Sequence, residues 1–138
     1  MESEQWLRIR AWTEPAEMPP RGGGEIIVEA EIPTGCYIES HEPSAEVLLP
    51  TILVLDSQEG LFIGPVRYPE PIERSLEWNE GALSLYEGKI KFSVPIEVHA
   101  EAVEGKKKIK GRITYQGCTS TICLMPGSQE FTVEFEVV

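Results

Sequence analysis

The sequence contains no apolar run long enough to cross a lipid bilayer, so no segment of it is expected to span a membrane. Its first five residues are acidic and polar, which does not fit a signal peptide. We therefore expect either a cytosolic protein or a fragment whose signal has been removed. The sequence also lacks a useful run of helical periodicity and any internal repeat, which leaves strands as the expected structure.

Positive charge is scarce in this sequence. Twelve Lys and Arg residues stand against 23 Asp and Glu residues, for a formal net charge of −11. A nucleic-acid partner is not expected, because neutralising phosphates requires a basic surface. Docking on an anionic lipid surface is disfavoured for the same reason.

Cysteine is also sparse, with three residues in 138. The count is odd, so one thiol is left over if two of them pair. It is too small for a disulfide-rich mini-protein, and a chain of this length can bury its own core. We expect residues 1–138 to form a single domain.

What the sequence does contain is alternation of apolar and polar residues with a period of two, the pattern of half-buried strands. The clear segments are residues 6–12, 25–32, 89–94, 96–102, 108–115 and 130–138, with weaker candidates at 36–39, 48–55 and 83–86. Breakers between them predict a turn at 56–60, a long polar connection at 68–80 and a hairpin turn at 104–107. Many short strands with regular turns predict an all-β sandwich.

The most informative stretch carries Cys118 and Cys123, five positions apart between two predicted strands. A disulfide here would close a short loop and stabilise the fold by roughly 2 kcal/mol in the chain-entropy model, a modest gain for a sandwich. A disulfide at a turn is open to an attacking thiolate, which thiol-disulfide exchange requires. Spacing alone leaves three interpretations: a redox-active pair, a local structural staple, or two unpaired buried thiols.

Metal binding is the weaker chemical alternative. A zinc site would need two more ligands, for which only Cys36, His41 and His99 are available. Copper(I) held by Cys118, Cys123 and Met125 is chemically feasible. We expect neither, and no cofactor is predicted.

Three stretches of the sequence resemble one known family. Tyr115-Gln116-Gly117-Cys118, followed by Cys123-Leu124-Met125-Pro126, is similar to the cysteine motif of the N-terminal periplasmic domain of the DsbD family of transmembrane thiol:disulfide interchange proteins. Residues 32–43 with the following Leu49-Pro50-Thr51, and residues 86–96, resemble further segments of that domain. The resemblance is strongest over residues 25–138.

The resemblance implies an immunoglobulin-like β-sandwich that carries reducing equivalents, as one domain of a protein-disulfide reductase. Cys118 and Cys123 would be the redox pair, with Cys123 forming the mixed disulfide. The donor would be a thioredoxin-like domain, and the acceptor a periplasmic disulfide isomerase or a cytochrome c maturation thioredoxin. The full-length protein would also carry a transmembrane domain, and this part of it would lie in the periplasm.

The family also has a loop that covers the disulfide and opens for partners. The matching region is residues 75–82, where Trp78 or Leu76 would be the lid, although Trp78 is equally well explained by packing at the sandwich edge. The neighbouring Glu77 and Glu80 would raise the pKa of a nearby thiol and keep it unreactive until a partner docks. Tyr37 and Ile122 are candidates to line the pocket, and both would also serve as plain packing residues.

The third cysteine, Cys36, is expected to be a buried, inert thiol, because free cysteine packs like a small apolar residue. A second class of function remains for the whole chain: a non-catalytic β-sandwich interaction module with a structural disulfide. The reduction potential of the cysteine pair separates the two.

Overall fold

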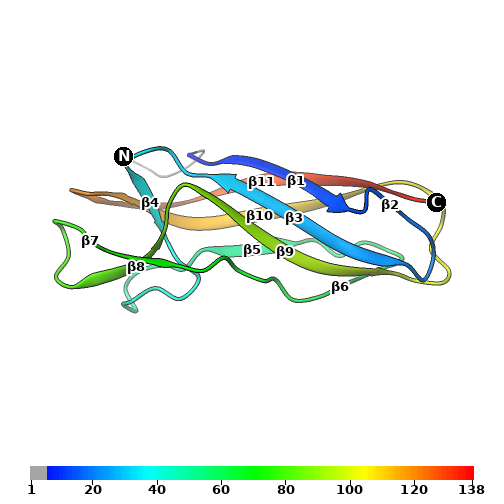
Figure 1. The fold of residues 1–138 in the computed structure, drawn as a ribbon, viewed down its shortest axis with the longest axis horizontal. Helices are drawn as coiled ribbons and strands as arrows, with labels where there is room; N and C mark the ends of the chain where they lie inside the picture. Colours follow the sequence, from blue (N-terminus) through cyan, green and yellow to red (C-terminus); the bar gives the residue numbers. More distant parts are fainter. Residues whose placement is uncertain (1–5) are drawn as a thin grey trace.

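The computed structural model describes residues 6–138, where the helices and strands assigned are all strands, and these form two sheets (Figure 1). The four-stranded sheet has the order β1-β3-β9-β6, made of Arg8–Glu14, Gly23–Glu31, Lys89–Val98 and Leu61–Ile63. The seven-stranded sheet has the order β2-β11-β10-β4-β8-β7, with β5 also paired to β10. Its strands are Glu17–Met18, Cys123–Val137, Gly105–Thr119, Cys36–Glu39, Ala82–Tyr86, Ile72–Ser75 and Ile52–Leu55. No helix that could span a membrane occurs within residues 6–138.

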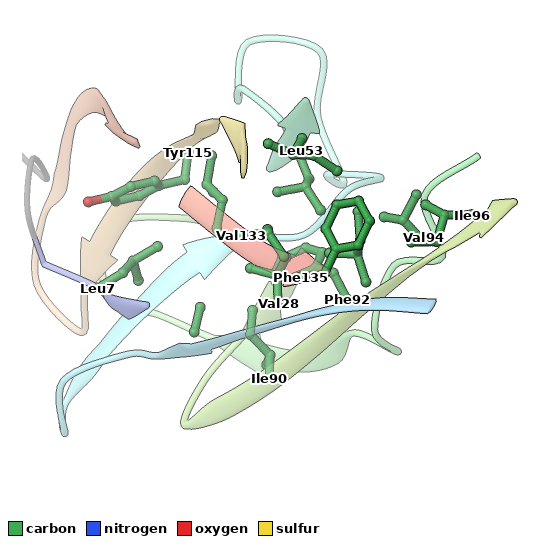
Figure 2. Close-up of a cluster of buried hydrophobic side chains, with 14 of the residues drawn as sticks. Leu7, Val28, Leu53, Ile90, Phe92, Val94, Ile96, Tyr115, Val133 and Phe135 are labelled. Carbon is green, nitrogen blue, oxygen red and sulfur yellow. The ribbon is translucent and has the colours of Figure 1, made fainter. Parts of the chain in front are cut away.

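The predicted alternation accounts for the main core, which fills the space between the sheets (Figure 2). Val28, Phe92 and Val133 are fully buried there, although they come from three different strands. Burying an aliphatic or aromatic side chain of this kind stabilises a fold by roughly 1.5–3 kcal/mol. The all-β sandwich expected from the sequence is therefore confirmed.

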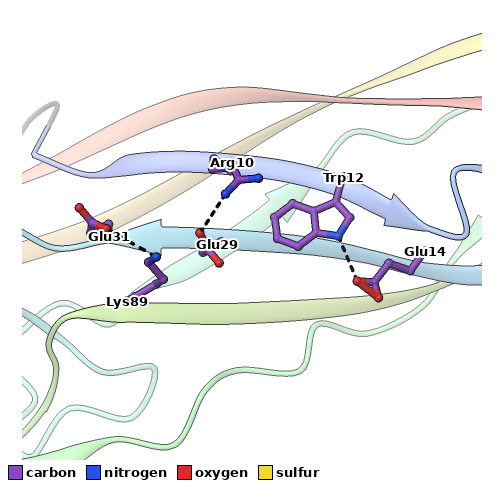
Figure 3. A network of polar contacts seen from close by, with 6 residues as sticks. All are labelled: Arg10, Trp12, Glu14, Glu29, Glu31 and Lys89. Carbon is purple, nitrogen blue, oxygen red and sulfur yellow. Dashed lines mark hydrogen bonds and ion pairs between the residues drawn. The ribbon is translucent and has the colours of Figure 1, made fainter.

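The outer face of the four-stranded sheet is polar, as the same alternation requires. Arg10 pairs with Glu29 at 3.8 Å, and Lys89 pairs with Glu31 at 3.9 Å (Figure 3). The Trp12 indole N–H donates a hydrogen bond to Glu14 Oε1 at 3.1 Å. These contacts lie on the sheet that does not carry the cysteines.

Several predicted boundaries were wrong. Residues 89–94 and 96–102 were expected to form two strands, but β9 runs unbroken from Lys89 to Val98. Pro95 has no N–H to donate, but its carbonyl accepts a hydrogen bond from Gly64 N. The strand therefore continues through the proline with the loss of one donor. The predicted polar connection at 68–80 contains β7, and the short strands β2 and β6 were not predicted.

The hairpin turn expected at residues 104–107 is also absent. Gly105 begins β10, and the chain turns earlier, at Ala100 and Glu101. Strands β9 and β10 belong to different sheets, so this connection crosses the sandwich instead of joining paired neighbours. Lys106 and Lys108 are exposed strand residues, not the tip of a hairpin.

The longest feature of the fold is the β10–β11 hairpin, which runs the length of the molecule (Figure 1). Its tip lies at the end where β4, β7 and β8 gather, whereas the C-terminus lies at the opposite end. Both cysteines of the motif lie at this tip. The hairpin therefore holds Cys118 and Cys123 at one end of the sandwich.

Candidate functional site

The two motif cysteines face each other across the last rungs of the hairpin. Cys118 on β10 is the antiparallel partner of Cys123 on β11, just beyond a bulge between Gln116 and Cys118. Opposed residues in antiparallel strands have Cα atoms about 4.5–5.5 Å apart. A disulfide requires a Cα separation of about 4.4–6.8 Å, so this register suits one. Both residues are free thiols in this structure.

The turn beyond the cysteines is short and internally bonded. Thr119 N donates to Ile122 O at 2.9 Å, which leaves only Ser120 and Thr121 as the loop. The Thr119 hydroxyl accepts hydrogen bonds from Thr121 N at 3.3 Å and Ile122 N at 3.2 Å. This turn keeps the strands paired up to the cysteines and fixes their register.

Gln116 ties the exposed thiol to the surrounding backbone. Its side-chain amide donates to Cys123 Sγ at 3.2 Å and to Leu124 O at 3.1 Å. Its Oε1 accepts a hydrogen bond from Leu49 N at 2.9 Å. Gln116 was part of the sequence motif, but nothing in the sequence assigned it this contact.

Beneath the cysteines lies a second, smaller apolar cluster, which we call the outer cluster. It contains Leu48, Leu76, Leu83, Leu85 and Cys118, with Tyr37, Ile72 and Trp78 packed against them. Successive strand residues point to opposite faces. Ile38 and Tyr86 belong to the main core, so their neighbours Tyr37 and Leu85 place the outer cluster on the other face of the seven-stranded sheet.

The outer cluster is covered by residues 76–79, which we call the cap segment. The Trp78 indole N–H donates to Thr119 O at 3.0 Å, and Glu77 N donates to Ser120 O at 2.9 Å. Asn79 N donates to Leu76 O at 3.2 Å, which folds the segment into a tight turn. The cap segment is thus fastened to the hairpin tip next to Cys118, which is fully buried beneath it.

We expect Trp78→Phe to loosen the cap segment, because phenylalanine keeps a ring but cannot donate to Thr119 O. Loss of one such hydrogen bond is worth about 1 kcal/mol, or roughly a fivefold increase in the open population. In a Cys36→Ser, Cys123→Ser background, where Cys118 is the sole thiol, its alkylation by iodoacetamide should accelerate about fivefold.

Trp12→Phe in the same background is the matched control, because Trp12 also donates one indole hydrogen bond, on the other sheet. It should leave the alkylation rate of Cys118 unchanged. An unchanged rate in Trp78→Phe as well would mean that the indole hydrogen bond does not limit access to this thiol.

The structure brings four of the six sequence-predicted residues into the outer cluster or its cover: Cys118, Leu76, Trp78 and Tyr37. Leu76 and Trp78 both contribute to the outer cluster and its cover, whereas the sequence analysis named them as alternative lid residues. Cys123 lies opposite Cys118 and is exposed. Ile122 is not brought into the pocket: it is 44% exposed at the hairpin tip, because the turn directs it outward.

The third cysteine departs from its expectation. Cys36 is half-buried instead of fully buried, and it packs against the main core. It lies on β4 opposite Thr119, at the end of the strand, where the sheet no longer covers it completely. Burial raises the pKa of its thiol.

Sequence reasoning missed Glu39, which is fully buried on β4. Both of its carboxylate oxygens lack a hydrogen-bond partner within residues 6–138. Period two from Tyr37 along β4 places Glu39 on the same face as a predicted pocket residue, and that signal was available in the sequence. Burial raises the pKa of Glu39 from 4.5 to about 7.

The two motif thiols are held in their protonated form. Burial, followed by the charge of Glu39, raises the pKa of Cys118 to about 12. The same two causes raise the pKa of Cys123. The sequence predicted raised pKa values, but it assigned them to Glu77 and Glu80, both of which are exposed. The acidic neighbour that acts on the cysteines is Glu39.

Within residues 6–138, no group of three or more His, Cys, Asp or Glu side chains is arranged to hold a metal ion. His41, a candidate zinc ligand, stacks on Tyr68 with ring centroids 3.6 Å apart. Its Nδ1 lies 3.1 Å from Thr51 O.

Residues 10–134 match the family described as the N-terminal part of the thiol:disulfide interchange protein DsbD. The match covers most of the chain, including the cysteine motif, and places the protein in the thiol-disulfide interchange class. More particularly, the chain belongs to the family of DsbD N-terminal domains. A search among curated proteins found no matching sequence.

Solved structures that share this fold include two N-terminal domains. The N-terminal periplasmic domain of ScsB from Proteus mirabilis matches with a TM-score of 0.58 and 16% identity, over 99% of this chain and 49% of the ScsB chain. The reduced DsbD N-terminal domain from Neisseria meningitidis matches with a TM-score of 0.50 and 22% identity, over 82% of both chains. The chain thus spans about half the length of the ScsB domain. The fold is the immunoglobulin-like β-sandwich expected from the sequence.

Proposed function

We propose that residues 1–138 form one thiol-disulfide exchange domain in which Cys118 and Cys123 alternate between a dithiol and a disulfide. The domain receives two electrons from a thioredoxin-like donor domain. It passes them to a periplasmic acceptor, either a disulfide isomerase or a cytochrome c maturation thioredoxin. In this proposal it acts in the periplasm, as part of a protein-disulfide reductase that also carries a transmembrane domain.

The observation that carries the proposal is the asymmetric placement of the two cysteines. They are direct cross-strand partners, yet Cys123 is exposed and Cys118 is fully buried under the cap segment. Exchange proceeds by attack of a thiolate on one sulfur while the other leaves. This arrangement supports Cys123 as the sulfur that forms the mixed disulfide and Cys118 as the one that leaves or returns.

The cap segment has a defined part in this proposal. An incoming thioredoxin-like protein must bring its sulfur to Cys123, next to the hairpin tip. Leu76 and Trp78 cover the cluster that contains Cys118. Hydrogen bonds from the Trp78 indole to Thr119 O and from Glu77 N to Ser120 O hold the cap segment in place. Opening the cap segment on docking would expose Cys118 only within a complex, which limits reactions with unrelated thiols.

The reduction potential of the pair tests the proposal. We expect a value above about −300 mV, near the range of thioredoxin-like carriers, measured by equilibrating the domain in dithiothreitol redox buffers. A disulfide with a potential below that value would be a structural bond, and the chain would then be a non-catalytic interaction module. Failure of Cys118 and Cys123 to form a disulfide at all would also overturn the proposal.

A further inference from the structure

Glu39 is a buried acidic residue near the cysteines that has no role in the proposed function. Its side chain is fully buried, and neither carboxylate oxygen has a hydrogen-bond partner within residues 6–138. Burying such a group without a partner costs roughly 1–3 kcal/mol. None of the ion pairs within the described residues includes Glu39, so no cation compensates for this burial.

Strand pairing places Glu39 on the same face of the sheet as Cys118. Tyr37 on β4 is the direct partner of Cys118 on β10. Glu39 lies two residues further along the same face of β4, which makes it a diagonal neighbour of Cys118. Diagonal neighbours are within reach of long side chains. The charge of Glu39 acts on both Cys118 and Cys123, which agrees with this placement.

The other groups around Glu39 leave it free to exchange a proton with sulfur. Leu85, its direct partner on β8, is apolar. Gln116 has its amide committed to Cys123 Sγ and Leu124 O. The titratable groups on this face nearest to Glu39 are the Cys118 and Cys123 thiols and the Tyr37 phenol, with Cys36 acting on Cys118 from the end of β4. Arg74 of β7 lies opposite Leu83 on the same face, and its guanidinium is paired with Glu87 at 2.7 Å. Glu77 and Glu80 of the cap region are exposed.

From this geometry we infer that Glu39 is a catalytic acid and base for the exchange reaction, delivering a proton to Cys118 Sγ when that sulfur leaves and removing it when that sulfur attacks. The inference rests on the proposed function, because it assigns a role within the same exchange step. It adds to that function a residue from β4 that lies outside the cysteine motif.

A dithiol such as dithiothreitol would reduce the oxidised domain in two exchange steps. A dithiothreitol thiolate attacks Cys123 Sγ, the Cys118–Cys123 bond breaks, and its electron pair stays on Cys118 Sγ. The Glu39 carboxyl group gives its proton to that sulfur and becomes a carboxylate. The second dithiothreitol thiolate then displaces Cys123 Sγ, which takes a proton from solvent, and the Glu39 carboxylate is reprotonated from solvent. The products are oxidised dithiothreitol and two protein thiols.

The protonation behaviour of the two groups fits these roles. A leaving sulfur whose thiol pKa is about 12 needs a proton, since its thiolate is strongly disfavoured in this site. A carboxyl group whose pKa is about 7 is protonated and ionised in comparable amounts at neutral pH. General acids and bases act best when their pKa lies near the working pH.

The test is the rate of reduction of the oxidised chain by dithiothreitol, followed from pH 5.5 to 8.5 and divided by the thiolate concentration. For the wild-type chain, this corrected rate constant should fall as pH rises through about 7, where Glu39 loses its proton. In Glu39→Gln this corrected rate constant should be independent of pH, and at pH 6 it should be about a hundredfold lower than in the wild type, the lower end of the usual range for general acid catalysis.

If Glu39 acted only through its charge, Glu39→Gln would change the reduction rate in the opposite direction. Removing the charge of Glu39 would make Cys118 a better leaving group, so Glu39→Gln would then react at the wild-type rate or faster. Either of those results overturns the inference. Glu29→Gln is the matched control, because Glu29 is a buried carboxylate on the other sheet, paired with Arg10, and this variant should keep the wild-type profile.

The same experiment separates this inference from the proposed function. If the wild-type chain forms no disulfide that dithiothreitol can reduce, the proposed function fails. If the wild-type chain reacts and Glu39→Gln matches it at every pH, only the role of Glu39 fails. Circular dichroism of both glutamine variants checks that each retains the β-sandwich.

Discussion

Cys118→Ser, made in a Cys36→Ser background, is expected to accumulate a stable mixed disulfide with glutathione, whereas Cys123→Ser in the same background forms none. Cys123 is exposed, so its thiolate can attack glutathione disulfide in solution. With Cys118 absent, no second sulfur displaces the glutathione, and the adduct persists. Intact-protein mass spectrometry should show complete conversion of the first variant.

The Cys123→Ser variant in the Cys36→Ser background retains only the Cys118 thiol. Cys118 is fully buried beneath the cap segment, and its pKa is raised to about 12 by burial and by Glu39. Almost none of it is thiolate at neutral pH, so Cys123→Ser should remain unmodified over the same period. The Cys36→Ser chain alone should form the Cys118–Cys123 disulfide and release glutathione. Equal adduct formation in both variants would contradict the assigned roles.

The period-two pattern predicted most of the strands, because alternation depends only on which face of a strand is buried. It located β4 at Cys36–Glu39, as observed. It did not reveal which strands pair. The break assumed at Pro95 is one example, since a proline can remain inside a strand when its carbonyl is bonded and its missing N–H is not needed.

The candidate site was predictable as far as the cysteine motif reached. Cys118 and Cys123 are close in sequence, so their pairing across a hairpin was a local inference. Alternation along β4 places Glu39 on the face of Tyr37, but it does not show that this face is buried at Glu39, because the strand paired there, with Leu85 of β8, is distant in the sequence. A glutamate is seldom fully buried, so the sequence alone provided no reason to expect Glu39 out of water.

The buried carboxyl group should also make the stability of the fold depend on pH. The pKa of Glu39 is raised from 4.5 to about 7 in the folded chain, so the folded state retains a proton that the unfolded chain has already lost. Below about pH 4.5 both states are protonated and the group has no effect. As pH rises from there to about 7, the free energy of unfolding therefore falls, and above that range the loss is complete.

The difference between 4.5 and about 7 corresponds to a loss of up to about 3 kcal/mol. Glutamine at position 39 cannot ionise, so Glu39→Gln should be more stable than the wild type by up to that amount at pH 7.5, and this advantage should disappear at pH 4.5. Urea denaturation of the reduced chains at both pH values measures the difference directly. Taking the difference between the two chains removes the contribution of the other carboxylates, which titrate in both.

Glu29→Gln is again the control variant, because Glu29 is paired with Arg10 at 3.8 Å. Its replacement therefore does not remove an unpartnered buried carboxyl group. This variant should not gain stability between pH 4.5 and 7.5. Suppose instead that the free energies of unfolding of Glu39→Gln and the wild type differ by the same amount at every pH in this range. That result would show that the carboxyl group at position 39 ionises in the folded chain as readily as in the unfolded chain. Its proton would then be unavailable to Cys118 near neutral pH, and the role in exchange would fall with it.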